Sequence, residues 1–218
     1  RTPMNQATQT LRHEHEAITL GLKILARMEQ RVNAEQITDI QDLSTMTDFL
    51  KTFADTCHHG KEEGILFPAL KDLDPKQTQG PIQGMLDEHA QGRQLLADMQ
   101  AALQPTLKIN AFHEAARAYA QLLLAHIEKE NTVLFPMAER LLSPEQQTQL
   151  AHAFDAHEDQ VMGPGQHEAL HATLKKLLAK YPAMLTAAAE GFAPHDVTFY
   201  LRELAAAYHS YYDAERIL

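Results

Sequence analysis

Two segments of the chain repeat one pattern of residues that can bind a metal ion. Each reads His-x-x-Lys-Glu, then three residues, then Leu-Phe-Pro, and the copies run from His58 to Pro68 and from His126 to Pro136. In an α-helix, residues four positions apart lie on the same face, so each copy is expected to place an imidazole beside a carboxylate. Such a pair can hold a metal ion.

A simpler repeat stands upstream of each copy. Glu14-His15 precedes the first copy and Glu88-His89 precedes the second, so the chain contains two half-sites in the same order, a lone histidine and then His-x-x-x-Glu. The candidate metal ligands are His15, His58, Glu62, His89, His126 and Glu130.

Four neutral imidazoles and two carboxylates suit a pair of first-row metal ions. Each glutamate could bridge the two ions, and two histidines would complete the protein ligands of each ion. A bridging oxide or hydroxide from solvent would then leave one open position per ion for a diatomic molecule or peroxide.

The alternative is that these histidines belong to the core. A single histidine on an apolar helix face is more often a hydrogen-bonded core residue than a ligand. Packing needs explain the repeat poorly, however, because burying Glu62 and Glu130 without partners would cost several kcal/mol. The repeated pattern therefore favours a metal site.

The elements that must position these residues are helices. Apolar residues recur at helical spacing over residues 8–31, 39–71, 81–105 and 110–142, with a loop expected at 72–80. Four helices with short connections predict an all-α, up-down four-helix bundle over residues 1–143. Further helices are expected at 144–161, 166–181 and 193–218, and we assign residues 144–218 to a C-terminal extension packed against the bundle.

Composition excludes several classes of partner. The net charge of −10 argues against a nucleic-acid or anionic-membrane partner, because both require clustered Lys and Arg. No apolar run approaches the roughly 20 residues of a membrane span, and the start shows no signal-peptide pattern, although a leader trimmed before Arg1 stays open. The single cysteine fits a reducing compartment, so a cytoplasmic location is expected, as monomer or homodimer.

The order His15, His58-x-x-x-Glu62, His89, His126-x-x-x-Glu130 resembles the hemerythrin-like (HHE cation-binding) family over about residues 8 to 142. The resemblance implies a four-helix bundle around a non-heme di-iron centre, with those six residues as ligands. Manganese at one position stays open, because oxygen and nitrogen donors accept both metals.

Two departures from the oxygen-carrying members of that family bear on function. Arg93 stands where they have a second histidine in the third helix, and they end in a histidine followed five residues later by Asp, where this chain has His126 and Glu130. One imidazole fewer leaves an ion more open, which favours redox chemistry over reversible oxygen carriage. We therefore expect a protein that reacts with O2, peroxide or nitric oxide as a peroxidase, catalase-like enzyme or oxidase, with an unknown electron donor. The alternative is a non-catalytic sensor, store or carrier of O2 or iron.

Other residues near the predicted ligands are candidates of lower rank. Tyr119, two turns before His126, and Arg93 are the candidate catalytic residues, with a core position and a solvent position as their respective alternatives. His59 and Glu63 are second choices for the ligand positions 58 and 62. Two further glutamates, Glu14 and Glu88, are expected on solvated faces.

The C-terminal region contains a rival metal motif. His167-Glu168-Ala169-Leu170-His171 matches His-Glu-x-x-His, in which two histidines bind zinc and the glutamate acts as a general base in metalloproteases. No strand is predicted to present a substrate beside it. A zinc protease is therefore the remotest of the three hypotheses.

Overall fold

The structure, a computed structural model, describes residues 7–34, 39–163 and 165–180, apart from the side chains of Asn33, His167, Glu168 and Lys180. All regular elements in these ranges are helical. They are α1 (Ala7–Asn33), α2 (Ile40–Phe49), η1 (Leu50–His59), η2 (Glu62–Leu66), α3 (Phe67–Leu73), α4 (Pro75–Leu103), α5 (Ile109–Lys129), η3 (Glu130–Leu134), α6 (Phe135–Leu141), α7 (Pro144–Val161) and α8 (Gln166–Lys180), where η marks a π-helix.

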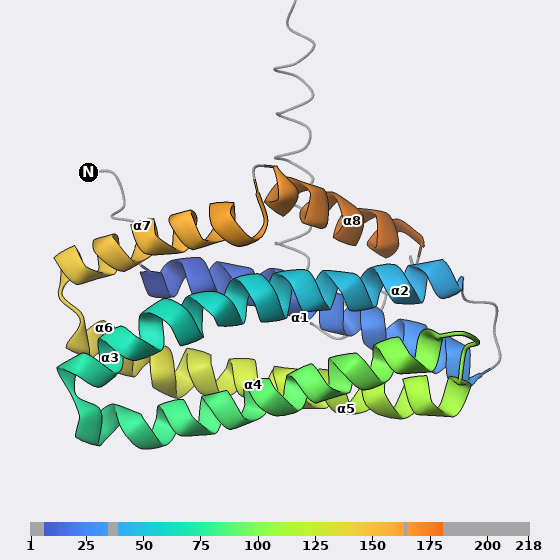
Figure 1. The fold of residues 1–218 in the computed structure, drawn as a ribbon, viewed down its shortest axis with the longest axis horizontal. Helices are drawn as coiled ribbons and strands as arrows, with labels where there is room; N and C mark the ends of the chain where they lie inside the picture. The colour runs from blue at the N-terminus through green and yellow to red at the C-terminus, as the bar shows by residue number, and fades with distance from the viewer. Residues whose placement is uncertain (1–6, 35–38, 164, 181–218) are drawn as a thin grey trace, which may run out of the picture. The chain divides into compact units, whose positions relative to one another are not determined.

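The helices up to α6 form an up-down four-helix bundle (Figure 1). Its four rods are α1, the continuous helix from α2 to α3, α4, and the continuous helix from α5 to α6. Helix α1 packs against α2 and α5, and α4 packs against α2 and α5, so each rod touches the rods before and after it. The predicted fold class is confirmed.

The helix starts follow ordinary capping chemistry. Asp39 accepts a hydrogen bond from the backbone of Gln41 at 2.9 Å, and Ser143 and Gln146 form a capping box ahead of α7. The predicted loop at 72–80 is wrong, because Asp74 caps a helix at this point by accepting from the backbone of Gln77 at 3.0 Å. Pro75 then occupies the first helical position, where its missing N–H costs nothing.

The Leu-Phe-Pro sequence marks the end of a π-helix in both copies of the motif. The backbone N–H of Phe67 bonds to the carbonyl of Glu62, and that of Phe135 bonds to the carbonyl of Glu130, five residues back. The next residue is a proline, which has no N–H, so the helix returns to α-helical bonding without leaving a donor unpaired. Both copies therefore place a π-turn directly at the glutamate of the metal motif.

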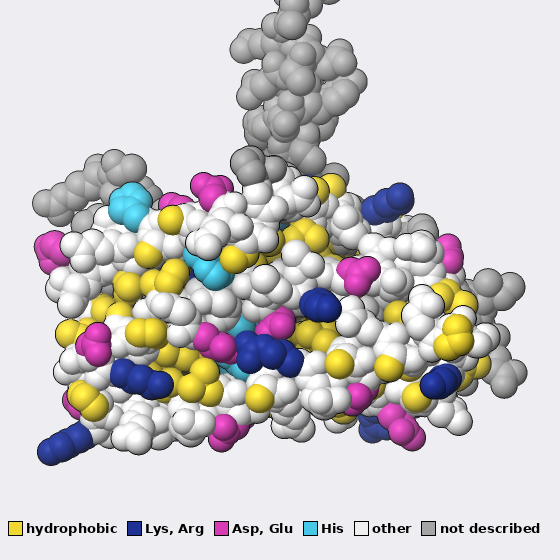
Figure 2. Space-filling model, in the orientation of Figure 1, with side chains coloured by type: hydrophobic (Ala, Val, Ile, Leu, Met, Phe, Trp, Pro, Cys, Tyr) yellow, Lys and Arg dark blue, Asp and Glu magenta, His cyan; other side chains and the backbone are white. Residues whose placement is uncertain are grey.

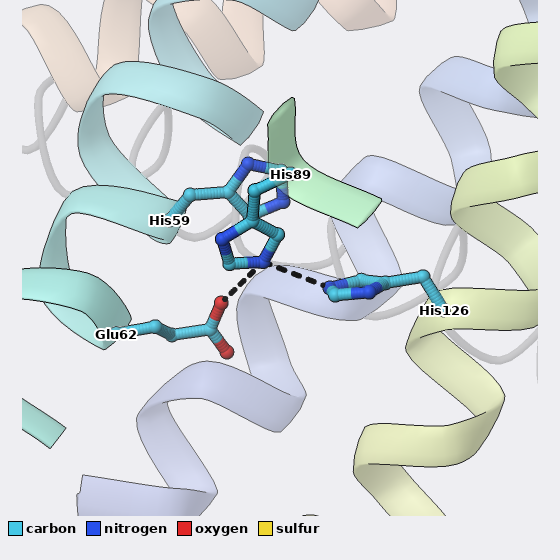
Figure 3. Close-up of side chains that lie close together, drawn as sticks. All are labelled: His59, Glu62, His89 and His126. Atoms are coloured by element: carbon cyan, nitrogen blue, oxygen red, sulfur yellow. Dashed lines mark hydrogen bonds and ion pairs between the residues drawn. The ribbon is translucent and has the colours of Figure 1, made fainter. Parts of the chain in front are cut away.

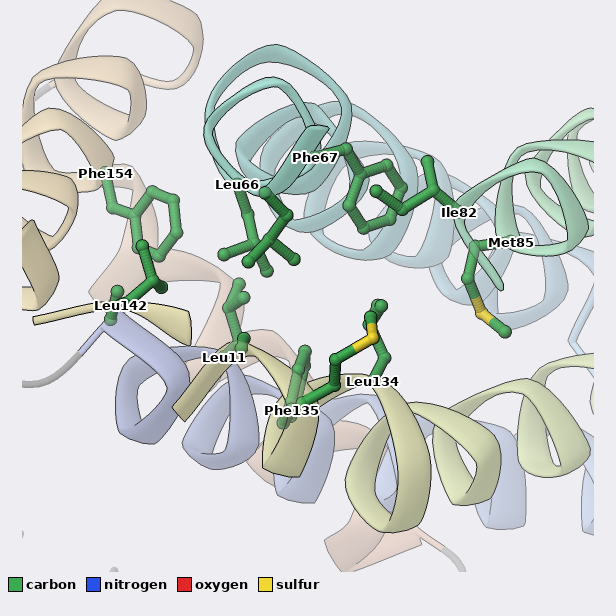
Figure 4. Close-up of a cluster of buried hydrophobic side chains, with 13 residues drawn as sticks. Leu11, Leu66, Phe67, Ile82, Met85, Leu134, Phe135, Leu142 and Phe154 are labelled. Atoms are coloured by element: carbon green, nitrogen blue, oxygen red, sulfur yellow. The ribbon is translucent and has the colours of Figure 1, made fainter. Parts of the chain in front are cut away.

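An apolar cluster closes the bundle near α3 and α6 (Figure 4). Its members include residues of the two Leu-Phe-Pro sequences, of α1, α4 and α7, and of the end of α6; the labelled ones are Leu11, Leu66, Phe67, Ile82, Met85, Leu134, Phe135, Leu142 and Phe154. The rings of Phe67 and Phe135 are about 1% exposed or less. This cluster keeps water away from one end of the bundle interior.

Helix α7 and the part of α8 up to Leu177 lie on the outside of the bundle (Figure 1). Helix α7 packs on α1, η1 and η2. Gly60 makes this contact close, because a Cβ at that position would lie 2.5 Å from Nε2 of His157. In α8, Leu174 and Leu177 are buried. The helix predicted at 193–218 lies outside the described residues, and the boundary predicted between residues 143 and 144 stays a prediction.

None of the helices in the described ranges is both long and apolar enough to cross a membrane.

Candidate metal centre

Two groups of buried side chains in the middle of the bundle have the composition and spacing of metal sites. One consists of His15, His58, Glu62 and Glu130, and the other of His59, Glu62, His89 and His126. Within each group the potential ligand atoms lie within 4.8 Å of one another. The structure thus brings all six sequence-predicted ligands together, with Glu62 common to both groups. Figure 3 shows the group of His59, Glu62, His89 and His126.

The four predicted ligand histidines each donate a hydrogen bond from Nδ1 to an acceptor on the side away from the centre. His58 pairs with Glu14 at 2.7 Å, His126 with Glu88 at 2.8 Å, His89 with Glu63 at 2.7 Å and His15 with Asn131 at 3.0 Å. A carboxylate or amide oxygen only accepts, so the hydrogen resides on Nδ1 and the Nε2 lone pair points inward. Inward Nε2 lone pairs are what a metal ion requires.

The spacing of the Nε2 atoms fits a shared cation. Nε2 of His15 lies 3.0 Å from Nε2 of His58, and Nε2 of His89 lies 3.1 Å from Nε2 of His126. Two lone pairs cannot hydrogen-bond to each other. A metal bound to imidazole at about 2.1 Å would hold two nitrogens at right angles about 3.0 Å apart.

The carboxylates of Glu62 and Glu130 each lie close to histidines of both groups. Glu62 directs Oε1 toward Nε2 of His58 and Oε2 toward Nε2 of His89, each at 3.5 Å. Oε2 of Glu130 lies 3.2 Å from Nε2 of both His15 and His126. This is the placement expected of two bridging ligands.

Among the described residues, the facing imidazoles are the ion-pair partners of the same two carboxylates. Both side chains are fully buried, and among the described residues none of their four oxygens has a hydrogen-bond partner. Burial and the nearby charge of Glu130 raise the pKa of Glu62 well above its usual value. A cation between the two carboxylates would offset both penalties, so the residues present fit a metal centre.

His59, only a second choice for a ligand position in the sequence analysis, is a member of one of the two groups. It is 3% exposed, and its ring stacks on that of His89 with centroids 3.8 Å apart. Its Nδ1 atom has no hydrogen-bond partner among the described residues, although Asp55 lies 3.6 Å away. Because a π-helix rotates less per residue than an α-helix, consecutive His58 and His59 both face the interior. Helical periodicity alone could not predict this.

The prediction that Glu14 is solvated is wrong. The residue is 4% exposed, and it bridges His58 and the ammonium group of Lys61, which lies 2.5 Å from Oε1. Lys61 is 1% exposed and also binds Glu158 of α7 at 2.6 Å. Burial lowers the pKa of His58 to about 4 although the Glu14 hydrogen bond acts in the opposite direction, so the ring is neutral at pH 7.

In the second copy of the motif, a glutamate again accepts from the histidine and the lysine, but closer to the surface. Glu88 accepts from His126 and from Lys129, whose side chain is 44% exposed. Glu88 is itself 22% exposed, so it is a hydrogen-bonded residue rather than a solvated one. The signal was present in the sequence, since both motif copies contain the lysine and both lone histidines follow a glutamate.

Arg93 is engaged by two carboxylates. It binds Glu63, and its Nε atom lies 2.7 Å from Asp55. Since Glu63 in turn accepts from His89, Arg93 acts on the centre through that carboxylate. The side chain is also 41% exposed, so it is both ion-paired and in contact with solvent, and its role as a candidate catalytic residue stays a prediction.

Tyr119 is fully buried in α5, and its hydroxyl has no hydrogen-bond partner among the described residues. Burial, with a contribution from Asp55, raises its pKa, so the phenol keeps its proton. Its role as a candidate catalytic residue stays a prediction.

The rival zinc motif is in α8. His171 lies edge-on to Phe53, with ring centroids 5.9 Å apart, and belongs to neither metal group found among the described residues. The side chains of His167 and Glu168 lie outside the described part of the chain.

Two family models match the chain. The hemerythrin HHE cation binding domain matches residues 6–138, and the DALR anticodon binding domain matches residues 137–218. No solved structure matches.

The curated relatives share only a short stretch with this chain. The arginine–tRNA ligase of Albidiferax ferrireducens is 93% identical over 42 residues, which is 19% of this chain and 7% of that protein. The arginine–tRNA ligase of Acidovorax ebreus is 87% identical over 45 residues, 21% of this chain and 8% of that protein. The chain therefore spans less than a tenth of the length of these relatives.

These matches contradict the prediction that the chain has no nucleic-acid partner. On the face shown in Figure 2, Lys and Arg side chains are scattered among Asp and Glu. The net charge of −10 argues against a broad basic surface, but it averages over the whole chain and does not exclude one local contact surface.

The first match covers more than half of the chain and includes every residue of both metal groups. The chain belongs to the hemerythrin HHE cation-binding domain family.

Proposed function

We propose that the centre holds two non-heme iron ions and that the protein reacts with O2, peroxide or nitric oxide. The observation that carries this proposal is the placement of Glu62, which is fully buried and directs one oxygen toward each half of the bundle. The ligands would be His15, His58, Glu62, His89, His126 and Glu130, joined by His59. When bound, iron supplies one-electron redox chemistry and positions open to small ligands.

The side chains around the centre hold the ligands in place and exclude water. Phe135 stacks on His15 with centroids 5.2 Å apart, and Phe67 lies 5.9 Å from His89. Each Phe of a Leu-Phe-Pro sequence thus supports a lone histidine. Tyr119 keeps a proton on its hydroxyl in this dry interior and is the candidate hydrogen-bond donor to a small ligand.

The test is catalytic removal of peroxide and of nitric oxide by protein reconstituted with iron, in the presence of a reductant. The Glu62→Ala and Glu130→Ala variants should lose the activity to background. Glu114→Ala, on the exposed side of α5, is the control and should keep the wild-type rate. Wild-type rates in both ligand variants would overturn the proposal. A stable O2 adduct without turnover would instead support a carrier or sensor.

We also propose that residues 137–218 contact tRNA. The supporting observation is the match of this segment to an anticodon-binding domain, together with relatives that are arginine–tRNA ligases. Nitrocellulose filter binding of the full chain to an arginine tRNA transcript at physiological salt tests it. Saturable binding at least tenfold tighter than to a polyuridine of equal length is expected, and equal binding of the two RNAs would refute the idea.

A cytoplasmic location and a monomeric or homodimeric state remain predictions that accompany this proposal.

A further inference from the structure

The two halves of the centre differ in what accepts the Nδ1 hydrogen of the lone histidine. The repeat makes Glu63 and Asn131 equivalent, because each directly follows the glutamate of a motif copy. His89 donates to a carboxylate oxygen of Glu63 at 2.7 Å, whereas His15 donates to the amide oxygen of Asn131 at 3.0 Å. One lone histidine thus has an anionic acceptor and the other a neutral one.

The charge of the acceptor sets how strongly the imidazole donates to a metal. A carboxylate on Nδ1–H increases the electron density at Nε2, and losing such a partner typically costs about 10- to 100-fold in metal affinity. Glu63 is also ion-paired with the guanidinium of Arg93, so the acceptor of His89 is a carboxylate held by a cation.

The guanidinium of Arg12 holds Asn131, the neutral acceptor, in place. Nη1 of Arg12 lies 3.0 Å from the backbone oxygen of Asn131 and 3.3 Å from its Oδ1 atom. The guanidinium fixes the amide with its oxygen toward His15 and draws electron density away from that oxygen. His15 is therefore the weaker donor of the two lone histidines.

A second asymmetry acts in the same direction. The repeat places Ile127 at the position equivalent to His59, so only one copy of the motif has adjacent histidines. His59 belongs to the group of His89 and His126, which has three imidazoles and Glu62, whereas the other group has two imidazoles with Glu62 and Glu130. Oε2 of Glu130 lies 3.2 Å from both His15 and His126, so the additional imidazole is the difference between the two positions.

The remaining histidines do not reverse this difference. His58 and His126 each donate to a carboxylate, Glu14 or Glu88, and each of these carboxylates is bound by a lysine. Glu158 adds a further negative charge on the His58 side, but it binds Lys61 and Cys57 and is 25% exposed. Its effect on the imidazole is indirect and partly screened.

We propose that the two metal positions are unequal: the position of His59, His89 and His126 fills first and holds its ion more tightly, while the position of His15 and His58 exchanges its ion. Glu63 and Asn131 are the positioning residues that set this difference. The inference rests on the two-metal centre proposed above.

The experiment is a titration of the chelator-stripped full chain with Co2+, followed by calorimetry and by the ligand-field absorption of the bound ion. Two resolved binding steps are expected for the wild type. Glu63→Gln should weaken the first step by about 10- to 100-fold, and Asn131→Asp should tighten the second step by about tenfold. Arg12 would pair with the new carboxylate, so the fold should tolerate it. Glu128→Gln, an exposed charge loss in the same helix as His126, is the control and should change neither step.

Weaker binding in Glu63→Gln together with tighter binding in Asn131→Asp would distinguish an electronic role of these two residues from a merely structural one. Two equal binding steps in the wild type, or weaker binding in Asn131→Asp, would overturn the inference while leaving a two-metal centre standing. Failure of the wild type to bind Co2+ at all would instead reject the two-metal centre, and the inference with it.

Discussion

Glu62→Gln is expected to change stability in opposite directions with and without bound metal. In chelator-stripped protein the substitution removes a buried carboxylate that has no hydrogen-bond partner among the described residues, so it should stabilise the fold by about 1–3 kcal/mol. In metal-loaded protein it removes the ligand common to both groups, so the stabilisation that metal binding confers should largely disappear. Urea unfolding with and without metal measures both effects.

The matched control is another buried glutamate that lies outside the centre. Glu29 is 5% exposed and binds His113. Glu29→Gln should therefore lower stability by the same amount in both states. If Glu62→Gln also behaved identically with and without metal, Glu62 would not be a ligand.

Lys61→Met is expected to destabilise the protein far more than Lys129→Met. The two lysines are equivalent in the repeat, but Lys61 is 1% exposed and neutralises Glu14 and Glu158, whereas the Lys129 side chain is 44% exposed. Removing the cation from a buried pair leaves an uncompensated charge and costs about 3–5 kcal/mol. An exposed pair contributes less than about 1 kcal/mol.

Denaturant midpoints of the two variants test this difference directly. Limited proteolysis would add a structural readout, because Glu158 connects α7 to Lys61 and cleavage within α7 should accelerate only in Lys61→Met. Equal losses of stability in both variants would mean that α7 does not shield the first half of the centre.

The main features of the fold and of the centre could be predicted from the repeated motif. Two copies of His-x-x-x-Glu, each preceded by a lone histidine, define which helix faces meet, and the structure brings those six residues together. The capped helix at Asp74 was missed because Pro81 looked like a helix start, although Pro75 is the better one.

The finer features of the site depend on geometry that sequence spacing does not encode. The π-helix ending at His59 turns a second histidine inward, which an α-helical wheel places about 100° away from His58. The pairing of Glu63 with His89 joins different helices, so no local pattern reveals it. The anticodon-domain match was missed because net charge says little about one local contact surface.

The most direct test of the two-metal centre is the metal content per chain of protein produced with iron available, measured beside a His58→Ala, Glu62→Ala double variant. The structure has two groups that could each hold an ion, so two irons per chain are expected in the wild type, and both should be lost in the variant. A single zinc ion that the variant retains would contradict this account and move the site to His167 and His171.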